Sequence, residues 1–197
     1  MEFSSREIRD LFLAWLALGV AFALFFDREI VTEFDAVSPA EFLSVVAGSL
    51  LTVGVAFLLH ELAHKVVAVH FNQVAEFRAD YGMLLFAIVG GLAGFIFAAP
   101  GAVHHRGRIT PREHGLIALA GPVTNYGLAI LSLPFVLLVP ELGWRAVGIN
   151  LLLAGFNMIP FGPLDGRTVL SWSKPVYALA AAPALLLVVF VLLGLSV

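Results

Sequence analysis

Two histidines and a glutamate stand together inside one of the most apolar stretches of the chain. His60, Glu61 and His64 form the pattern H-E-x-x-H within VAFLLHELAHKVVAV, residues 55–69. Residues four apart share one face of a helix, so both imidazoles can bind a single Zn²⁺ ion. Glu61 is about 100° further round that helix, where it can accept a proton from an attacking water. The pattern predicts a zinc-dependent hydrolytic centre.

The apolar surroundings argue against a chance match to this short pattern. Each ionisable side chain in a membrane helix costs about 2.5–3.5 kcal/mol on insertion scales. A bound ion explains that cost, because it gives the neutral imidazoles a partner. A catalytic zinc site usually has three protein ligands, and the chain has no cysteine. The third ligand must therefore be a histidine or a carboxylate.

Asp165 is the best candidate for the third ligand. It follows an apolar segment, in the sequence NMIPFGPLDGRTVL, where Pro160 and Pro163 prevent a regular helix and free backbone carbonyls. Such an unwound helix end at membrane depth is typical of a site, although an ordinary cytoplasmic turn is the alternative. The remaining histidines have the wrong spacing or lie in a polar loop: His70, His104, His105 and His114.

The composition is that of an integral membrane protein. Hydrophobic residues make up 60% of the 197 positions, charged residues 13%, and the mean hydropathy is +0.98. The absence of a basic stripe argues against nucleic acid as a partner. Since no repeat or long polar linker divides the sequence, we expect one membrane domain over residues 1–197. Its motif-bearing core is expected at about 41–170, with peripheral spans at 8–26 and 175–197.

Apolar segments long enough to cross a bilayer recur along the chain. A span is expected to begin at Pro39, with Ser38 as its N-cap. A cleaved signal peptide ending near Ala21–Ala23 is the alternative for the first segment. Spans are predicted at residues 11–26, 39–71, 115–139, 144–159 and 175–197.

The apolar segment Met83–Ala99 is interrupted by glycines and is predicted to enter and leave the membrane on one side. Nine Lys and Arg residues then lie on the cytoplasmic side and two outside, whereas a full crossing gives five against six. The positive-inside rule favours the first arrangement. The predicted fold is an all-α polytopic membrane protein. It has about five to six transmembrane helices and a re-entrant, possibly β-containing hairpin that lines the active-site cavity.

This topology also brings the candidate ligands together. His60 and His64 lie near the inner end of their span, and Asp165 emerges on the inner side only if Met83–Ala99 does not cross. The expected location is therefore the cell membrane, with several spans and an active site accessible from the cytoplasmic side.

Three motifs in this order resemble the site-2 protease family of intramembrane zinc metalloproteases. They are HELAH at residues 60–64, AGPVTN at 120–125 and NMIPFGPLDG at 157–166, within a match of about residues 53–170. The resemblance implies one Zn²⁺ per chain, bound by His60, His64 and Asp165, with Glu61 as the catalytic acid and base. It also implies an endopeptidase that hydrolyses peptide bonds in or near transmembrane segments of protein substrates, in the lipid bilayer.

Two asparagines are candidates for substrate binding. Asn157 can bind the substrate backbone or the developing oxyanion. Asn125 can take a similar role or only join helices, and Gly121 with Pro122 is expected to permit close helix packing. A membrane zinc transporter or sensor without protease activity is the alternative function.

Overall fold

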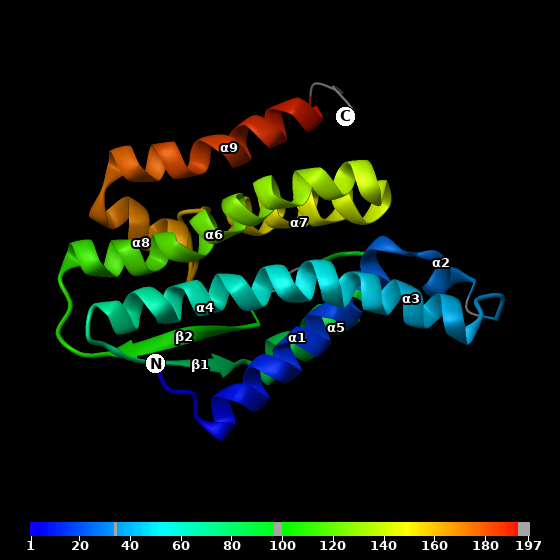
Figure 1. Cartoon of the computed structure of the whole chain (residues 1–197), viewed down its shortest axis with the longest axis horizontal. Coiled ribbons are helices and arrows are strands. Elements are labelled where there is room, and N and C mark those ends of the chain that lie inside the picture. The colour runs from blue at the N-terminus through cyan, green and yellow to red at the C-terminus, as the bar shows by residue number, and fades with distance from the viewer. Residues whose placement is uncertain (34, 97–99, 193–197) are drawn as a thin grey trace. The chain divides into compact units, whose positions relative to one another are not determined.

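The computed structural model describes residues 1–33, 35–96 and 100–192, which are mostly helical (Figure 1). Two short strands interrupt the helices. In chain order the elements are α1 (Ser5–Phe26), α2 (Glu29–Thr32), α3 (Pro39–Ser49), the π-helical turn η1 (Leu50–Gly54), α4 (Val55–His70), β1 (Val74–Ala79), α5 (Tyr81–Ala93), β2 (Gly101–Arg106), α6 (Pro111–Leu138), α7 (Pro140–Asn157), α8 (Asp165–Trp172) and α9 (Lys174–Leu192).

The chain forms two compact units. The first comprises Met1–Leu58 and Ala75–His104, and the second comprises Leu59–Val74 and His105–Val197. His60, Glu61, His64, Asn125, Asn157 and Asp165 all belong to the second unit. The expectation of a single domain with peripheral spans stays a prediction.

Capping side chains define where the long helices begin. Ser38 accepts from the N–H of Glu41, whose carboxylate accepts from the Ser38 N–H, which confirms the predicted start at Pro39. The same reciprocal arrangement joins Thr110 and Glu113 at the start of α6. These capping boxes satisfy backbone donors that the first helical turn leaves unpaired.

Within the described residues, three helical stretches are long and apolar enough to cross a membrane: Ser5–Phe26, Pro39–His70 and Pro111–Leu138. The second runs without a break through α3, η1 and α4. The structure also forms helices at two other predicted spans, as α7 and α9. The count of five spans with one re-entrant element stays a prediction.

The expected interruption of Met83–Ala99 by its glycines is wrong for most of the segment. Residues 81–93 form the continuous helix α5, and Gly90 and Gly91 lie inside it. The reason is packing in the first unit, because a Cβ on Gly91 would overlap the backbone of Ala21 in α1. The helix ends only at Gly94, which has a φ of 84°. The rest of the predicted segment includes residues 97–99, which lie outside the described part.

The predicted β component is present as a two-stranded sheet, whose strands come before and after α5 in the sequence. β1 and β2 run antiparallel (Figure 1), and the N–H of Asp80 donates to the carbonyl of Pro100 at 2.9 Å. The chain therefore leaves the sheet before α5 and returns to the same end of it. This return agrees with a re-entrant element, although its place in a membrane stays a prediction.

The second unit is built on the α6–α7 hairpin. α8 packs against α6, and α9 packs against α7 and α8. Its core includes Ala118 of α6, Met158 after α7, Val169 of α8 and Ala181 of α9. This packing positions the beginning of α8, where Asp165 lies.

Candidate metal centre

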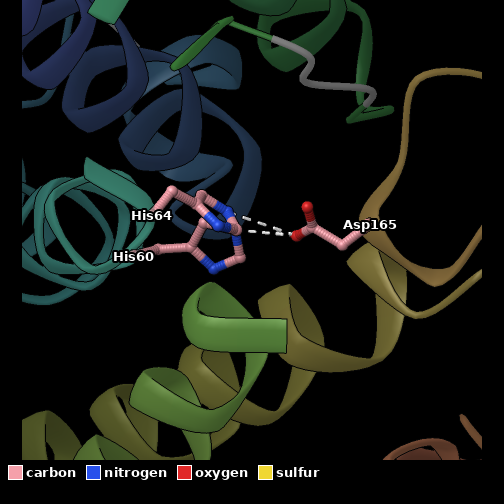
Figure 2. A group of neighbouring side chains, drawn as sticks. All are labelled: His60, His64 and Asp165. Atoms are coloured by element: carbon pink, nitrogen blue, oxygen red, sulfur yellow. Dashed lines mark ion pairs between the residues drawn. The ribbon is translucent and has the colours of Figure 1, made fainter. Parts of the chain in front are cut away.

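The two motif histidines project from one face of α4, as their spacing predicts. His60 and His64 are 3% and 7% exposed, and their rings lie edge to face with centroids 4.7 Å apart. Both imidazoles point toward the carboxylate of Asp165 (Figure 2). Glu61 is also buried, at 8% exposure.

Asp165 reaches this place through a bend and a helix start. After α7 ends at Asn157, residues 158–164 are not helical, as the prolines there predict, and α8 begins at Asp165 itself. Gly166 makes the bend tight, since a Cβ there would overlap the carbonyl group of Met158. The carboxylate lies at a helix N-terminus, where the helix dipole favours negative charge.

The three side chains form a group with the dimensions of a metal site. Asp165 Oδ2 lies 3.3 Å from His60 Nε2 and 3.4 Å from His64 Nε2. A tetrahedral zinc ion with ligands at about 2.0–2.2 Å separates its ligand atoms by about 3.3–3.6 Å. Among the described residues, this is the group of three or more such side chains that can hold a metal ion. The two separations from Asp165 thus match those of zinc ligands, and all three candidate ligand atoms lie within 4.8 Å of one another.

The electrostatics of Asp165 favour its role as an anionic ligand. The carboxyl lies beside the two imidazoles and at the first residue of α8, and the helix N-terminus favours its anionic form. Its Oδ2 atom is buried and accepts no hydrogen bond from the described residues, so it can take a metal ion as its partner.

Hydrogen bonds at the far side of each ring orient both imidazoles. His64 Nδ1 lies 2.7 Å from the carbonyl oxygen of Ile117, which can only accept. His60 Nδ1 lies 2.5 Å from Asn125 Oδ1. With the proton on Nδ1, each Nε2 presents its lone pair to the site, as metal-binding histidines require.

Gly121 of α6 leaves the space in front of the two Nε2 atoms. A Cβ at this position would lie 2.5 Å from His64 Nε2 and even closer to His60 Nε2. The expected close approach at Gly121 is thus confirmed, and the groups that approach it are the imidazoles of His60 and His64.

The structure gives the two candidate asparagines partners within the protein. Asn125 is fully buried and bonded to His60. The Asn157 amide donates to the Leu153 carbonyl at 3.0 Å. Substrate binding by either residue stays a prediction. The four other histidines lie outside the metal group.

Sequence reasoning missed two groups that hold the ligands. One is the Ile117 carbonyl, for which an amino-acid sequence gives no signal. The other is Asn150, which receives a hydrogen bond from Asn125. Its signal was present, since an amide within the apolar segment 144–159 needs a buried partner.

Comparisons with known proteins agree with this site. The chain is 38% identical over 190 residues to "Putative zinc metalloprotease MJ0611" of Methanocaldococcus jannaschii, covering 92% of each chain. The same descriptive name is given to YwhC of Bacillus subtilis, 29% identical over 65% of this chain and 69% of the relative. It is also given to Rip3 of Mycobacterium tuberculosis, 31% identical over 61% of this chain and 29% of the relative.

No protein-family model matches the chain, and no solved structure matches it. The similarity to MJ0611 nevertheless extends over nearly the full length of both proteins. It includes the stretch from His60 to Asp165 that builds the metal group. The protein therefore belongs to this family of zinc metalloproteases.

Proposed function

We propose that this protein is a zinc-dependent intramembrane endopeptidase of the site-2 protease type. The observation that carries the proposal is the convergence of His60, His64 and Asp165 around a space that fits zinc. The two histidines lie in a helical stretch, Pro39–His70, that is long and apolar enough to span a membrane. A metal centre on such a helix is suited to substrates that are themselves in the bilayer.

The chemistry divides between the metal and Glu61. A zinc ion held by the three ligands supplies a Lewis acid and makes water more acidic. Glu61 accepts one proton from the attacking water, while the water oxygen forms a bond to the scissile carbonyl carbon. Glu61 then gives that proton to the amine nitrogen as the carbon–nitrogen bond breaks. One water is consumed, and Glu61 returns to its starting charge.

Asn157 is proposed to bind the substrate near the metal group. It is the last residue of α7, and the bend of residues 158–164 separates it from Asp165. Its amide now donates to Leu153 within its own helix. Because the Leu153 bond is local, a rotation of the side chain can redirect this donor to a substrate carbonyl.

A helical substrate must unwind before cleavage, and the outer edge of β1 is proposed to hold it extended by strand addition. The structure adds a condition. The N–H of Phe77 donates to Glu7 at 3.0 Å, and the N–H of Ala79 donates to Asp10 at 3.3 Å. These outward N–H groups are the ones a new strand would use. Substrate pairing therefore requires that the two carboxylates of α1 release the edge.

The protein is proposed to cross the membrane several times with its active site open to the cytoplasm. The surplus of Lys and Arg on the side assigned to the cytoplasm supports this orientation. The partners would be the lipid bilayer and transmembrane protein substrates.

Fragments of membrane proteins in cells test the proposal. Cells that produce the wild type are compared with cells that produce Glu61→Gln, and peptides from their membranes are analysed by mass spectrometry. Fragments ending within transmembrane segments should appear only with the wild type. Identical fragment sets, with both proteins present at equal level, would contradict proteolysis and leave a zinc transporter or sensor as the alternative.

A further inference from the structure

A chain of three buried hydrogen-bonded groups leads from α7 to the metal group. The Nδ2 of Asn150 donates to the Ala146 carbonyl at 2.9 Å. Asn125 Nδ2 donates to Asn150 Oδ1 at 2.9 Å, and Asn125 Oδ1 lies 2.5 Å from His60 Nδ1. Asn150, Asn125 and His60 are 4%, 0% and 3% exposed.

The direction of this chain follows from its far end. A backbone carbonyl can only accept, so the Ala146 carbonyl binds the amide nitrogen of Asn150 and leaves its oxygen toward Asn125. Asn125 must then present its own nitrogen to Asn150 and its oxygen to His60. An oxygen at His60 Nδ1 requires the proton on Nδ1. In the neutral ring, which is the form that binds a metal, the lone pair is then on Nε2, which faces Asp165.

We infer that Asn125 and Asn150 are positioning residues, which fix the His60 tautomer that binds metal. This inference rests on the proposed zinc site. Asn125 acts on the ring directly, and Asn150 acts through Asn125. His64 does not need such a chain, because the Ile117 carbonyl fixes its ring.

The burial of the chain makes this role necessary. In water, an imidazole exchanges between its two neutral tautomers, and an amide can turn to suit either. In the interior, a reversed amide would place two donors or two acceptors face to face, and an unsatisfied buried group costs about 1–3 kcal/mol. Outer partners of metal-binding histidines typically change metal affinity by about 10–100-fold.

A double-mutant cycle tests the inference in the purified full-length protein. Asn150→Leu removes the group that orients Asn125. Asn125→Asp replaces the amide with a carboxylate. Either of its oxygens can accept from the His60 Nδ1–H, so orientation by Asn150 is no longer needed. Ser132→Ala, which removes a hydrogen bond to Leu128 on the same helix as Asn125, is the control.

Zinc affinity is measured by competition with a chelator. Asn150→Leu should lower the affinity about tenfold in the wild-type background and by less than about twofold in the Asn125→Asp background. Ser132→Ala should bind zinc like the wild type. Equal losses in both backgrounds, or no loss in either, would overturn the role of Asn150.

Ring ¹⁵N NMR of the zinc-free protein gives a second measurement that does not depend on activity. Asn125→Leu should lower the fraction of His60 with its proton on Nδ1, and Asn125→Asp should restore it. If Asn125→Leu folds and only its melting temperature changes, while the His60 tautomer stays the same, then Asn125 has a structural role only and the inference is wrong. A protein that binds zinc but cleaves no substrate would contradict proteolysis and leave this inference intact.

Discussion

Gly121 lies against His64 so closely that a β-carbon on Gly121 would be 2.5 Å from the Nε2 atom. The same β-carbon would overlap His60 Nε2. Both contacts fall on the atoms that face Asp165, so even a methyl group would enter the space that fits the ion. The small residue in AGPVTN thus leaves room for the candidate metal group.

Gly121→Ala should lower the zinc affinity by at least about 10-fold. Loss of the groups that orient metal-binding histidines typically lowers the affinity by about 10–100-fold, and a displaced imidazole should cost at least as much. Chelator competition measures the loss. Gly127→Ala on the same helix is the matched control, because nothing lies within 4 Å of its Cβ position. The control should bind zinc normally and be slightly more stable, since alanine favours a helix over glycine. Equal zinc affinity in both variants would contradict the described site.

Replacement of any single ligand should abolish stoichiometric zinc binding. His60→Ala, His64→Ala and Asp165→Ala each leave two ligands where a catalytic site usually has three. The metal content of the purified variants, measured by mass spectrometry, checks this. His70→Ala, an exposed histidine on the same helix, should keep its zinc. Full occupancy in Asp165→Ala would mean that another residue is the third ligand.

Much of this site was predictable because each candidate ligand carries a local signal. The spacing of His60 and His64 matches the helical period, and the prolines around Asp165 predict the bend that presents it. Asn150 stood out as an amide in an apolar segment, but its pairing with Asn125 depends on how α6 packs against its neighbours. The same packing places the Ile117 carbonyl, and no local pattern encodes it.

The fold shows the same limit in α5. Its glycines suggested breaks, yet Gly91 serves a close contact with Ala21, and only Gly94 ends the helix. A sequence does not tell a glycine that breaks a helix from one that lets two helices approach, because the difference lies in the neighbouring helix. The capped start at Pro39, in contrast, depends only on adjacent residues and was confirmed.

Strand addition predicts that Ala79→Pro blocks cleavage and leaves zinc bound. Proline removes the outward N–H of residue 79, which now donates to Asp10. An edge strand tolerates proline better than a central strand does. Cleavage of a reconstituted transmembrane substrate and the zinc content are measured on the same sample. Unchanged cleavage would reject substrate pairing at this edge.

Topology can be tested with introduced cysteines, since the chain has none. Ala36 and His104 are both exposed. His104 is preferable to nearby Gly107, whose φ of 150° and contact with Gln73 disfavour any side chain. A membrane-impermeant thiol reagent should label Ala36→Cys in intact cells and label His104→Cys only after the membrane is opened. Labelling of His104→Cys from outside would make the segment around α5 a full span.

The most direct test of the account is Glu61→Gln, measured for metal and for catalysis in one preparation. Glutamine has the size of glutamate but cannot accept and return a proton, so the metal group should persist while proton transfer fails. The account predicts zinc content equal to the wild type and cleavage of a reconstituted transmembrane substrate slowed by at least about 10²-fold. Cleavage at the wild-type rate, with zinc present, would contradict it.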